Sequence, residues 1–129
     1  MARFDKYDPV AGGFRGVAAA ANTNTENFDK VLGAGVDATG KVVVADDGVD
    51  GFKGVTIVDR TKRRAGDVLD VMTHGEIVDV TGLTAGTTYF LNATTGVLQT
   101  DATRYRVGHT MEAWRLVVRF QDLYEIAGA

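Results

Sequence analysis

Apolar and polar residues alternate most clearly between Trp114 and Phe120. Two sets of side chains point to opposite faces there: Trp114, Leu116, Val118 and Phe120 against Arg115, Val117, Arg119 and Gln121. A period of two is that of a β-strand with one buried face. The pattern therefore predicts a strand near the end of the chain, with the first set of side chains in the core.

A second informative stretch is Ala65–Val80, with the sequence AGDVLDVMTHGEIVDV. It contains two short runs of β-forming residues, Asp67–Met72 and Glu76–Val80, joined by Thr73, His74 and Gly75. Valine, leucine and isoleucine fit a pleated surface, and glycine suits a tight connection. The pattern predicts a β-hairpin, which needs further strands to cover it because an isolated hairpin is only marginally stable.

Short apolar runs separated by glycine and threonine recur along the rest of the chain. A further hairpin is predicted from residues 30–36 and 41–45, and single strands at 52–58, 88–91, 97–98 and 105–111, with Gly108 as a candidate bulge. About nine short strands at spacings near ten residues predict an all-β fold, a small antiparallel β-barrel or sandwich. The predicted core consists of Val42, Val44, Val55, Ile57, Leu69, Val71, Val78, Phe90, Leu91, Trp114, Leu116, Val118 and Phe120.

The N-terminal segment follows neither period. Phe4, Tyr7 and Phe14 are separated by charges and glycines, and Pro9 disfavours a helix. Two interpretations are open: a disordered terminus, or an extended arm that becomes ordered on a neighbouring molecule, since disordered segments rarely carry aromatic residues. We expect an extended N-terminal arm with a short helical or irregular segment over residues 1–29, a β-barrel domain over 30–121 and a short C-terminal tail over 122–129.

Composition narrows the class of protein. The 129 residues suffice for one domain, and the net charge of −3 argues against a dedicated nucleic-acid binder. The absence of cysteine excludes disulfides and thiolate metal sites. No apolar run approaches the roughly 20 residues of a membrane span, and the first ten residues lack the apolar segment of a signal peptide. We expect a protein that is made, and kept or assembled, inside a cell, without membrane or nucleic-acid partners.

Candidate catalytic chemistry is sparse. His74 lies near Glu76 and His109 near Glu112, so a metal site of two histidines and one carboxylate, in a hydrolase, is one hypothesis. The loop DDGVDG at 46–51 suggests calcium but lacks the alternating ligands and terminal glutamate of a calcium loop. The chain has no serine or cysteine nucleophile. We expect no enzymatic activity and no cofactor or metal.

The densest basic run is DRTKRR at residues 59–64, with Arg60, Lys62, Arg63 and Arg64. Its simplest interpretation is an exposed loop whose charges keep sheet edges from pairing with other chains. Contact with an acidic protein surface is the second interpretation, and phosphate binding is the third.

Three stretches resemble a known family: FDKYDPVAGGFRG near the N-terminus, AGDVLDVMTHGEIVDV with LTAGTTYFLNATTGVL in the centre, and RVGHTMEAWRLVVRF near the C-terminus. They resemble the head decoration proteins, or capsid cement proteins, of tailed bacteriophages, in particular the small β-barrel type of phages that infect actinobacteria. The resemblance extends from Phe4 to Phe120. The central pattern GLTAGTTYFLNATTG also resembles strand–turn–strand units of phage tail and fibre domains.

The resemblance implies a structural protein of the virion. Such proteins bind the outer surface of the assembled capsid, often as trimers, and bridge neighbouring major capsid subunits. We therefore expect the major capsid protein and further copies of this chain as partners. The expected capsid contacts are Phe4, Tyr7, Pro9, Phe14 and Arg15 in the arm, followed by Arg60, Lys62, Arg63 and Arg64. The alternatives are a phage tail or fibre module and a carbohydrate-binding β-module.

Overall fold

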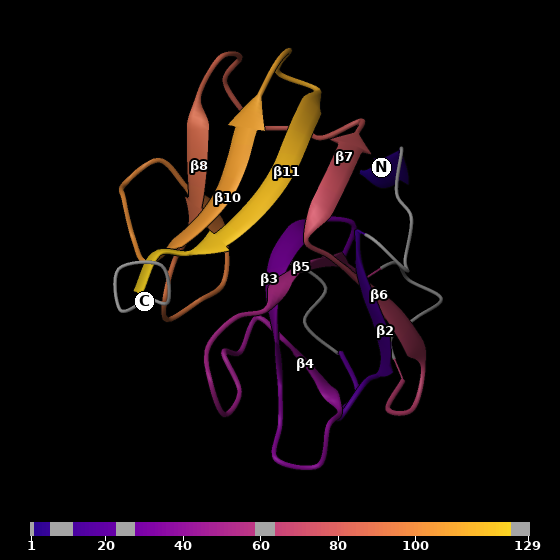
Figure 1. Ribbon diagram of the computed structural model, residues 1–129. Coiled ribbons are helices and arrows are strands. Elements are labelled where there is room, and N and C mark those ends of the chain that lie inside the picture. Colours follow the sequence, from indigo (N-terminus) through magenta and orange to yellow (C-terminus); the bar gives the residue numbers. More distant parts are fainter. Residues whose placement is uncertain (1, 6–11, 23–27, 59–63, 125–129) are drawn as a thin grey trace.

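The described residues form two antiparallel β-sheets in a computed structural model, which describes residues 2–5, 12–22, 28–58 and 64–124 (Figure 1). The strands are β1 (Arg3–Asp5), β2 (Gly13–Val17), β3 (Val31–Val36), β4 (Val42–Val44), β5 (Gly54–Ile57), β6 (Val68–Met72), β7 (His74–Val78), β8 (Thr88–Leu91), β9 (Leu98–Gln99), β10 (Tyr105–Thr110) and β11 (Arg115–Asp122). The predicted all-β class is confirmed. The two sheets form a sandwich and are not closed into a barrel.

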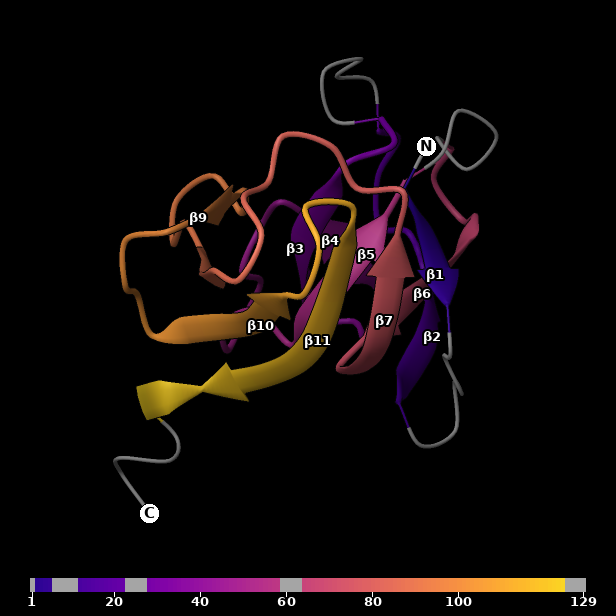
Figure 2. The same cartoon turned by 90° about the horizontal axis from the view of Figure 1, so that it is seen from above.

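Sheet A has six strands in the order β1-β7-β11-β10-β8-β9, and sheet B has five in the order β2-β6-β5-β3-β4. Seen from above, β10, β11 and β7 form one side of the molecule, and β3, β5 and β6 lie behind them (Figure 2). The predicted hairpin of β3 and β4 is confirmed, with Gly35 opposite Val43. The predicted return strand after β8 is also confirmed, as β9 pairs with β8.

The predicted central hairpin is wrong. β6 belongs to sheet B and β7 to sheet A, although Thr73 alone separates them. The N–H groups of Thr73 and His74 both donate to the carbonyl of Gly12, at 2.7 and 3.0 Å. The Thr73 carbonyl accepts from the N–H of Phe120 at 2.8 Å. The chain therefore turns a corner between the sheets, because the backbone groups of β6 and β7 find partners on β2 and β11 instead of on each other.

The described part of the N-terminal segment is not an arm. β1 pairs with β7, and β2 pairs with β6 along its whole length. After β2, Ala18 forms a single parallel bridge with Val42, so residues 18–21 are irregular and not helical. The predicted domain boundary at residue 30 is therefore wrong for these strands, which are edges of the two sheets. The rest of the short helical or irregular segment expected within residues 1–29 falls largely on 23–27, outside the described residues.

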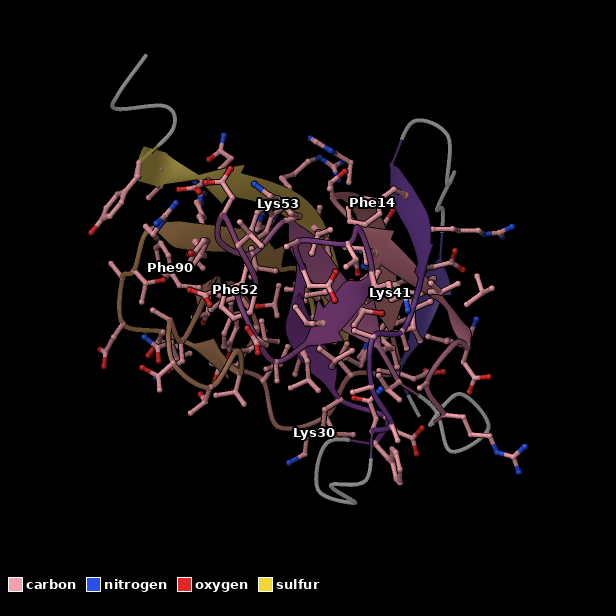
Figure 3. All side chains as sticks on the ribbon, turned by 90° about the horizontal axis from the view of Figure 1, so that it is seen from below. Phe14, Lys30, Lys41, Phe52, Lys53 and Phe90 are labelled. Atoms are coloured by element: carbon pink, nitrogen blue, oxygen red, sulfur yellow. The ribbon has the colours of Figure 1, made fainter. Side chains whose placement is uncertain are left out.

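Two hydrophobic clusters hold the fold. The larger lies between the sheets and contains Phe52, Met72, Ile77, Leu91, Tyr105, Val107, Leu116 and Val118; the smaller lies within sheet B and contains Ala18, Ala34, Val42, Val58, Leu69 and Val71. The rings of Phe52 and Tyr105 meet edge to face, with centroids 5.0 Å apart. Figure 3 shows Phe52 and Phe14 in different parts of the molecule, in keeping with the two clusters.

The predicted core is confirmed for most of its members. Val44, Ile57 and Phe120 are only partly buried, and Phe90 is half-buried on the outer face of sheet A, opposite Arg106. The prediction that Trp114 belongs to the core is wrong, because its side chain is 50% exposed. At the N-terminal end of β11, the pairing with β10 begins at Leu116, which lies opposite Thr110. Trp114 precedes this pair and lies in the turn between the two strands.

The irregularity expected at Gly108 is present. The register of β10 against both β11 and β8 shifts between Arg106 and Gly108. Tyr105 and Val107 are buried before the shift, and Thr110 is buried after it. Strict alternation from Tyr105 would have turned His109 inward, whereas the shift leaves His109 only partly buried, opposite Val117.

Candidate interaction surface

The two described aromatic residues of the N-terminal segment pack on their own domain. Phe4 lies on β1 opposite Ile77 and packs against the larger cluster. Phe14 lies on β2 opposite Val71 and packs against the smaller cluster. Both side chains are thus partly buried on their own domain, and their predicted contacts with a partner stay predictions. Tyr7 and Pro9 lie outside the described residues, so their predicted contacts stay predictions.

Arg15 lies on β2 of sheet B, and its side chain is largely exposed. Its Nε lies 2.7 Å from Oδ1 of Asp70 on the neighbouring strand, and its side chain is 62% exposed. An exposed ion pair of this kind contributes little to stability. Val17 and Val68, directly opposite each other on the same two strands, are exposed apolar residues. Arg15 thus keeps its accessibility, and its predicted partner contact stays a prediction.

The basic loop enters the described structure only at Arg64. This residue is exposed, and its backbone N–H donates to Oδ2 of Asp67 at 2.9 Å. Arg60, Lys62 and Arg63 lie outside the described residues. The structure thus places Arg15 and Arg64 on or beside sheet B and Phe4 on the edge strand of sheet A. It does not bring the described candidates together into one site.

The two histidines lie on the same face of sheet A, but β11 separates them. His74 is opposite Arg119, and His109 is opposite Val117. Glu76 on β7 lies opposite Val117 on β11. Glu112 accepts two hydrogen bonds from Arg115, of 2.7 and 3.1 Å. Within the described ranges, no group of three or more metal-ligating side chains could hold a metal ion.

The acidic loop at residues 46–51 uses its carboxylates locally. Oδ1 of Asp46 accepts from the N–H of Gly48 at 2.9 Å, and Asp50 pairs with Lys53 at 3.2 Å. Such hydrogen bonds within a turn are the usual role of aspartate in this position. The loop therefore shows the chemistry of a stabilised turn.

A compact polar cluster closes the end of β11. Asp122, with a side chain only 5% exposed, accepts two hydrogen bonds from Arg104, at 3.0 and 2.5 Å. The Arg104 guanidinium stacks between the rings of Tyr105 and Tyr124, 4.8 and 4.7 Å from their centroids. The carboxylate of Asp122 raises the pKa of Arg104, and burial raises the pKa of Tyr105. Tyr124 itself is 66% exposed, so this cluster presents one aromatic ring to solvent.

The opposite end of β11 presents a second aromatic ring. The turn from Met111 to Trp114 carries two large exposed apolar side chains, Met111 and Trp114. Arg115 fixes the base of this turn: it binds Glu112 and also lies 3.2 Å from Oε1 of Glu76. The hydrogen bonds from Arg115 hold the pKa of Glu112 below its ordinary value. Because Trp114 fits the alternating pattern, nothing in the local sequence indicates that it lies outside the core.

Two small hollows lie on the surface of the described residues. One of about 120 Å³ is lined by Ala2, Val80 and Leu83 among others, and one of about 160 Å³ lies between residues 20–22 and β4. Pockets for small-molecule ligands usually have volumes of about 300–1,000 Å³. In the described ranges, no helix has the length and apolar character needed to cross a membrane.

Comparisons with known proteins identify the fold. No protein-family model and no curated protein matches the chain. Among solved structures, a chain from Mycobacterium phage Patience superimposes with a TM-score of 0.84 at 21% sequence identity, and the match covers 94% of this chain and 96% of the phage chain. At this identity the likeness concerns the fold, and it extends over nearly the whole of both chains. The two-sheet architecture described above is therefore one that a bacteriophage protein also has.

Proposed function

We propose that this chain is a structural virion protein of a tailed bacteriophage, which binds the outer surface of the assembled capsid and bridges neighbouring major capsid subunits. The observation that carries the proposal is the near-complete fold match to a phage chain. The resemblance of residues 4–120 to head decoration proteins supplies the finer assignment to the capsid.

The proposed mechanism is stabilisation by binding. A protein that binds the assembled shell, and not the separate subunits, lowers the free energy of the shell in proportion to the number of bound copies. Such a protein needs a rigid body. The two sheets and the cluster between them meet this requirement, since the chain passes directly from one sheet to the other at Thr73 and the cluster packs between them.

A tail or carbohydrate-binding module is the second candidate, and Trp114 is the observation that favours it. Half-exposed tryptophan rings can stack on sugar rings, and Arg115 and Glu112 lie beside this one. Under this alternative, the purified protein binds glycans on an array and the Trp114→Ala variant loses the signal. A capsid-binding protein instead gives no glycan signal with either form.

The decisive experiment uses virions of the phage or prophage whose genome encodes the chain. Heads and tails are separated, the proteins of each are identified by mass spectrometry, and the heads are imaged by electron cryo-microscopy. We expect the chain in the head fraction, as density on the outer surface that contacts more than one capsid subunit. Its presence in tails alone, or its absence from virions, would overturn the proposal.

A functional readout follows from the same material. Heads that lack the chain should release their DNA at a lower temperature than complete heads, and addition of the purified protein should restore the release temperature. The matched control is an equal concentration of an unrelated β-protein. Unchanged release temperature with and without the chain would argue against a stabilising role.

A further inference from the structure

The outer face of sheet A is covered by no other described element. In Figure 2, β10, β11 and β7 lie along one side of the molecule, β3, β4 and β5 of sheet B lie behind them, and β2 and β6 lie beside β7. Antiparallel sheets commonly have one face on the core and one toward solvent. On this solvent side, Arg106 lies opposite Gln121 on one neighbour and Phe90 on the other. Arg119 lies opposite His74. We call these five residues the basic face.

The two arginines of the basic face have no carboxylate partner in the described part of the chain. Arg3, Arg15, Arg104 and Arg115 all pair with aspartate or glutamate at 3.2 Å or less. Arg106 and Arg119 are exposed, and no ion pair within the described ranges involves either. Their charges are thus available to a partner, while those of the other four are largely satisfied.

Arg119 is held in place by the sheet. Its Nη1 donates to the carbonyl of Val118 at 2.6 Å and to that of Gly75 at 3.3 Å. The guanidinium therefore lies against the backbone of β11 and β7, with its remaining N–H groups free to donate further. A side chain fixed in this way loses less conformational entropy when it binds.

The five residues of the basic face include no acid, although the whole chain has a net charge of −3. Glu76 lies one row away, already 3.2 Å from the guanidinium of Arg115, and Asp5 lies opposite Glu76 on the edge strand β1. Half-buried Phe90 adds an aromatic surface beside Arg106. Arginine and aromatic residues are the types enriched in protein interfaces.

We propose that the basic face docks on an acidic surface of a protein partner, through Arg106 and Arg119, with Phe90 as the apolar contact. The inference rests on the proposed function, under which the acidic surface belongs to the outside of the capsid. Complementary charge fixes the orientation of a complex and accelerates its formation. A nucleic acid fits less well, because binding the phosphate backbone usually takes about 6–10 cationic contacts and a basic protein.

The test compares two double variants with equal changes in charge. The Arg106→Glu/Arg119→Glu variant reverses the basic face. The Lys30→Glu/Lys41→Glu variant reverses two exposed cations beside sheet B. Each protein is added to heads stripped of the chain, and binding is measured by co-sedimentation at about 0.15 M salt. We expect the first variant to lose affinity at least about tenfold and the second to bind like the wild type. Circular dichroism checks that both are folded, and Arg106→Gln/Arg119→Gln serves as a neutral second variant.

The outcomes separate the two proposals. If the wild type binds heads and the first variant binds them with equal affinity, the proposed docking role of the basic face is overturned. The proposed function is not affected by that result. Failure of the wild type to bind heads counts against the proposed function, and the basic face is then judged by an NMR titration with poly-L-glutamate. Chemical-shift changes concentrated on residues of β7, β10 and β11 support the docking role of the basic face. Chemical-shift changes elsewhere, or no changes, overturn it. Tighter binding of duplex DNA than of poly-L-glutamate on this face also overturns it, since the partner would not be a protein.

Discussion

The inner and outer faces of β10 and β11 are built from alternating residues of the same two strands, yet they differ in kind. The inner face carries Leu116 and Val118, with no exposed side-chain surface. The outer face carries Arg106 and Arg119, which are exposed. Packing fixes the inner set, because each of those side chains fills space between two sheets. The outer set is under no such constraint and is free to carry charge for binding.

The irregularity between Arg106 and Gly108 is what keeps the two faces distinct. It lets Tyr105 and Thr110, whose positions differ by an odd number, both face inward. Thr110 is satisfied there by hydrogen bonds from its hydroxyl to the Thr84 carbonyl and from the N–H of Thr87. The comparison teaches that one local break in the ladder decides which residues of β10 reach solvent.

The largest effect is expected from Gly108→Val. A Cβ at this position would lie 2.0 Å from the carbonyl oxygen of Val117, so the ladder must shift. We expect a loss of more than about 3 kcal/mol in the free energy of unfolding, measured by urea denaturation. Gly86→Ala is the matched control, because Gly86 also has a positive φ but nothing within 4 Å of its Cβ position. Its cost should be about 1 kcal/mol. Equal losses in both variants would show that the irregularity has no special role.

The next effect sharpens the contrast between adjacent residues. Leu116→Ala removes a buried side chain of the inner face and should cost about 2–5 kcal/mol. Val117→Ala, one residue further on the outer face, should cost less than about 1.5 kcal/mol, because its side chain is only partly buried. Both are measured by thermal and urea unfolding. A reversed order would mean that the outer face of this protein is covered in solution.

An intermediate effect is expected from Asp122→Asn. The buried carboxylate accepts from Arg104 and from the N–H of Tyr124, and the amide cannot replace both of its oxygens as acceptors. We expect a loss of about 1–3 kcal/mol. Asp79→Asn is the control, since its pair with Arg3 is exposed on both sides and should contribute less than about 1 kcal/mol. Calorimetry at neutral pH distinguishes them, and a larger loss for Asp79→Asn would contradict the argument from burial.

The smallest effect depends on pH. Two hydrogen bonds from Arg115 hold the pKa of Glu112 below its ordinary value of 4.5. A carboxylate with a lowered pKa in the folded state stabilises that state above its unfolded pKa, and the contribution is lost as the pH falls through the folded pKa. The stability difference between wild type and Glu112→Gln should therefore be small at pH 7 and vanish in acid. A carboxyl titration by NMR with a midpoint at or above 4.5 would refute the lowered pKa.

Local pattern predicted the elements but not all of their partners. The strands at 88–91, 105–111 and 114–120 were predicted because their residues alternate or are β-branched, and most of their inward side chains are buried as expected. β1 and β2 were missed as strands because short edge strands rich in glycine and charge carry little pattern of their own. They are strands because β7 and β6 offer them backbone partners.

The candidate surface was predicted less well than the fold. The outward direction of Arg119 follows from alternation in β11, but that of His109 does not, because the register shift near Gly108 changes the parity of β10. Arg104 and Asp122 are 18 residues apart, and nothing in the local sequence of either one indicates their pairing. Side chains that act through distant partners leave no local period to detect.

By itself, the sequence determined the all-β class, the positions of most strands and the residues that avoid water, because these follow from side-chain chemistry and a period of two. Only the tertiary structure decided that Thr73 is a corner between two sheets, that Phe4 and Phe14 pack on their own domain, and that Trp114 remains outside it. Those outcomes depend on which backbone groups meet across long stretches of chain. That choice is made by the summed free energy of the packed sheets and not by any single segment.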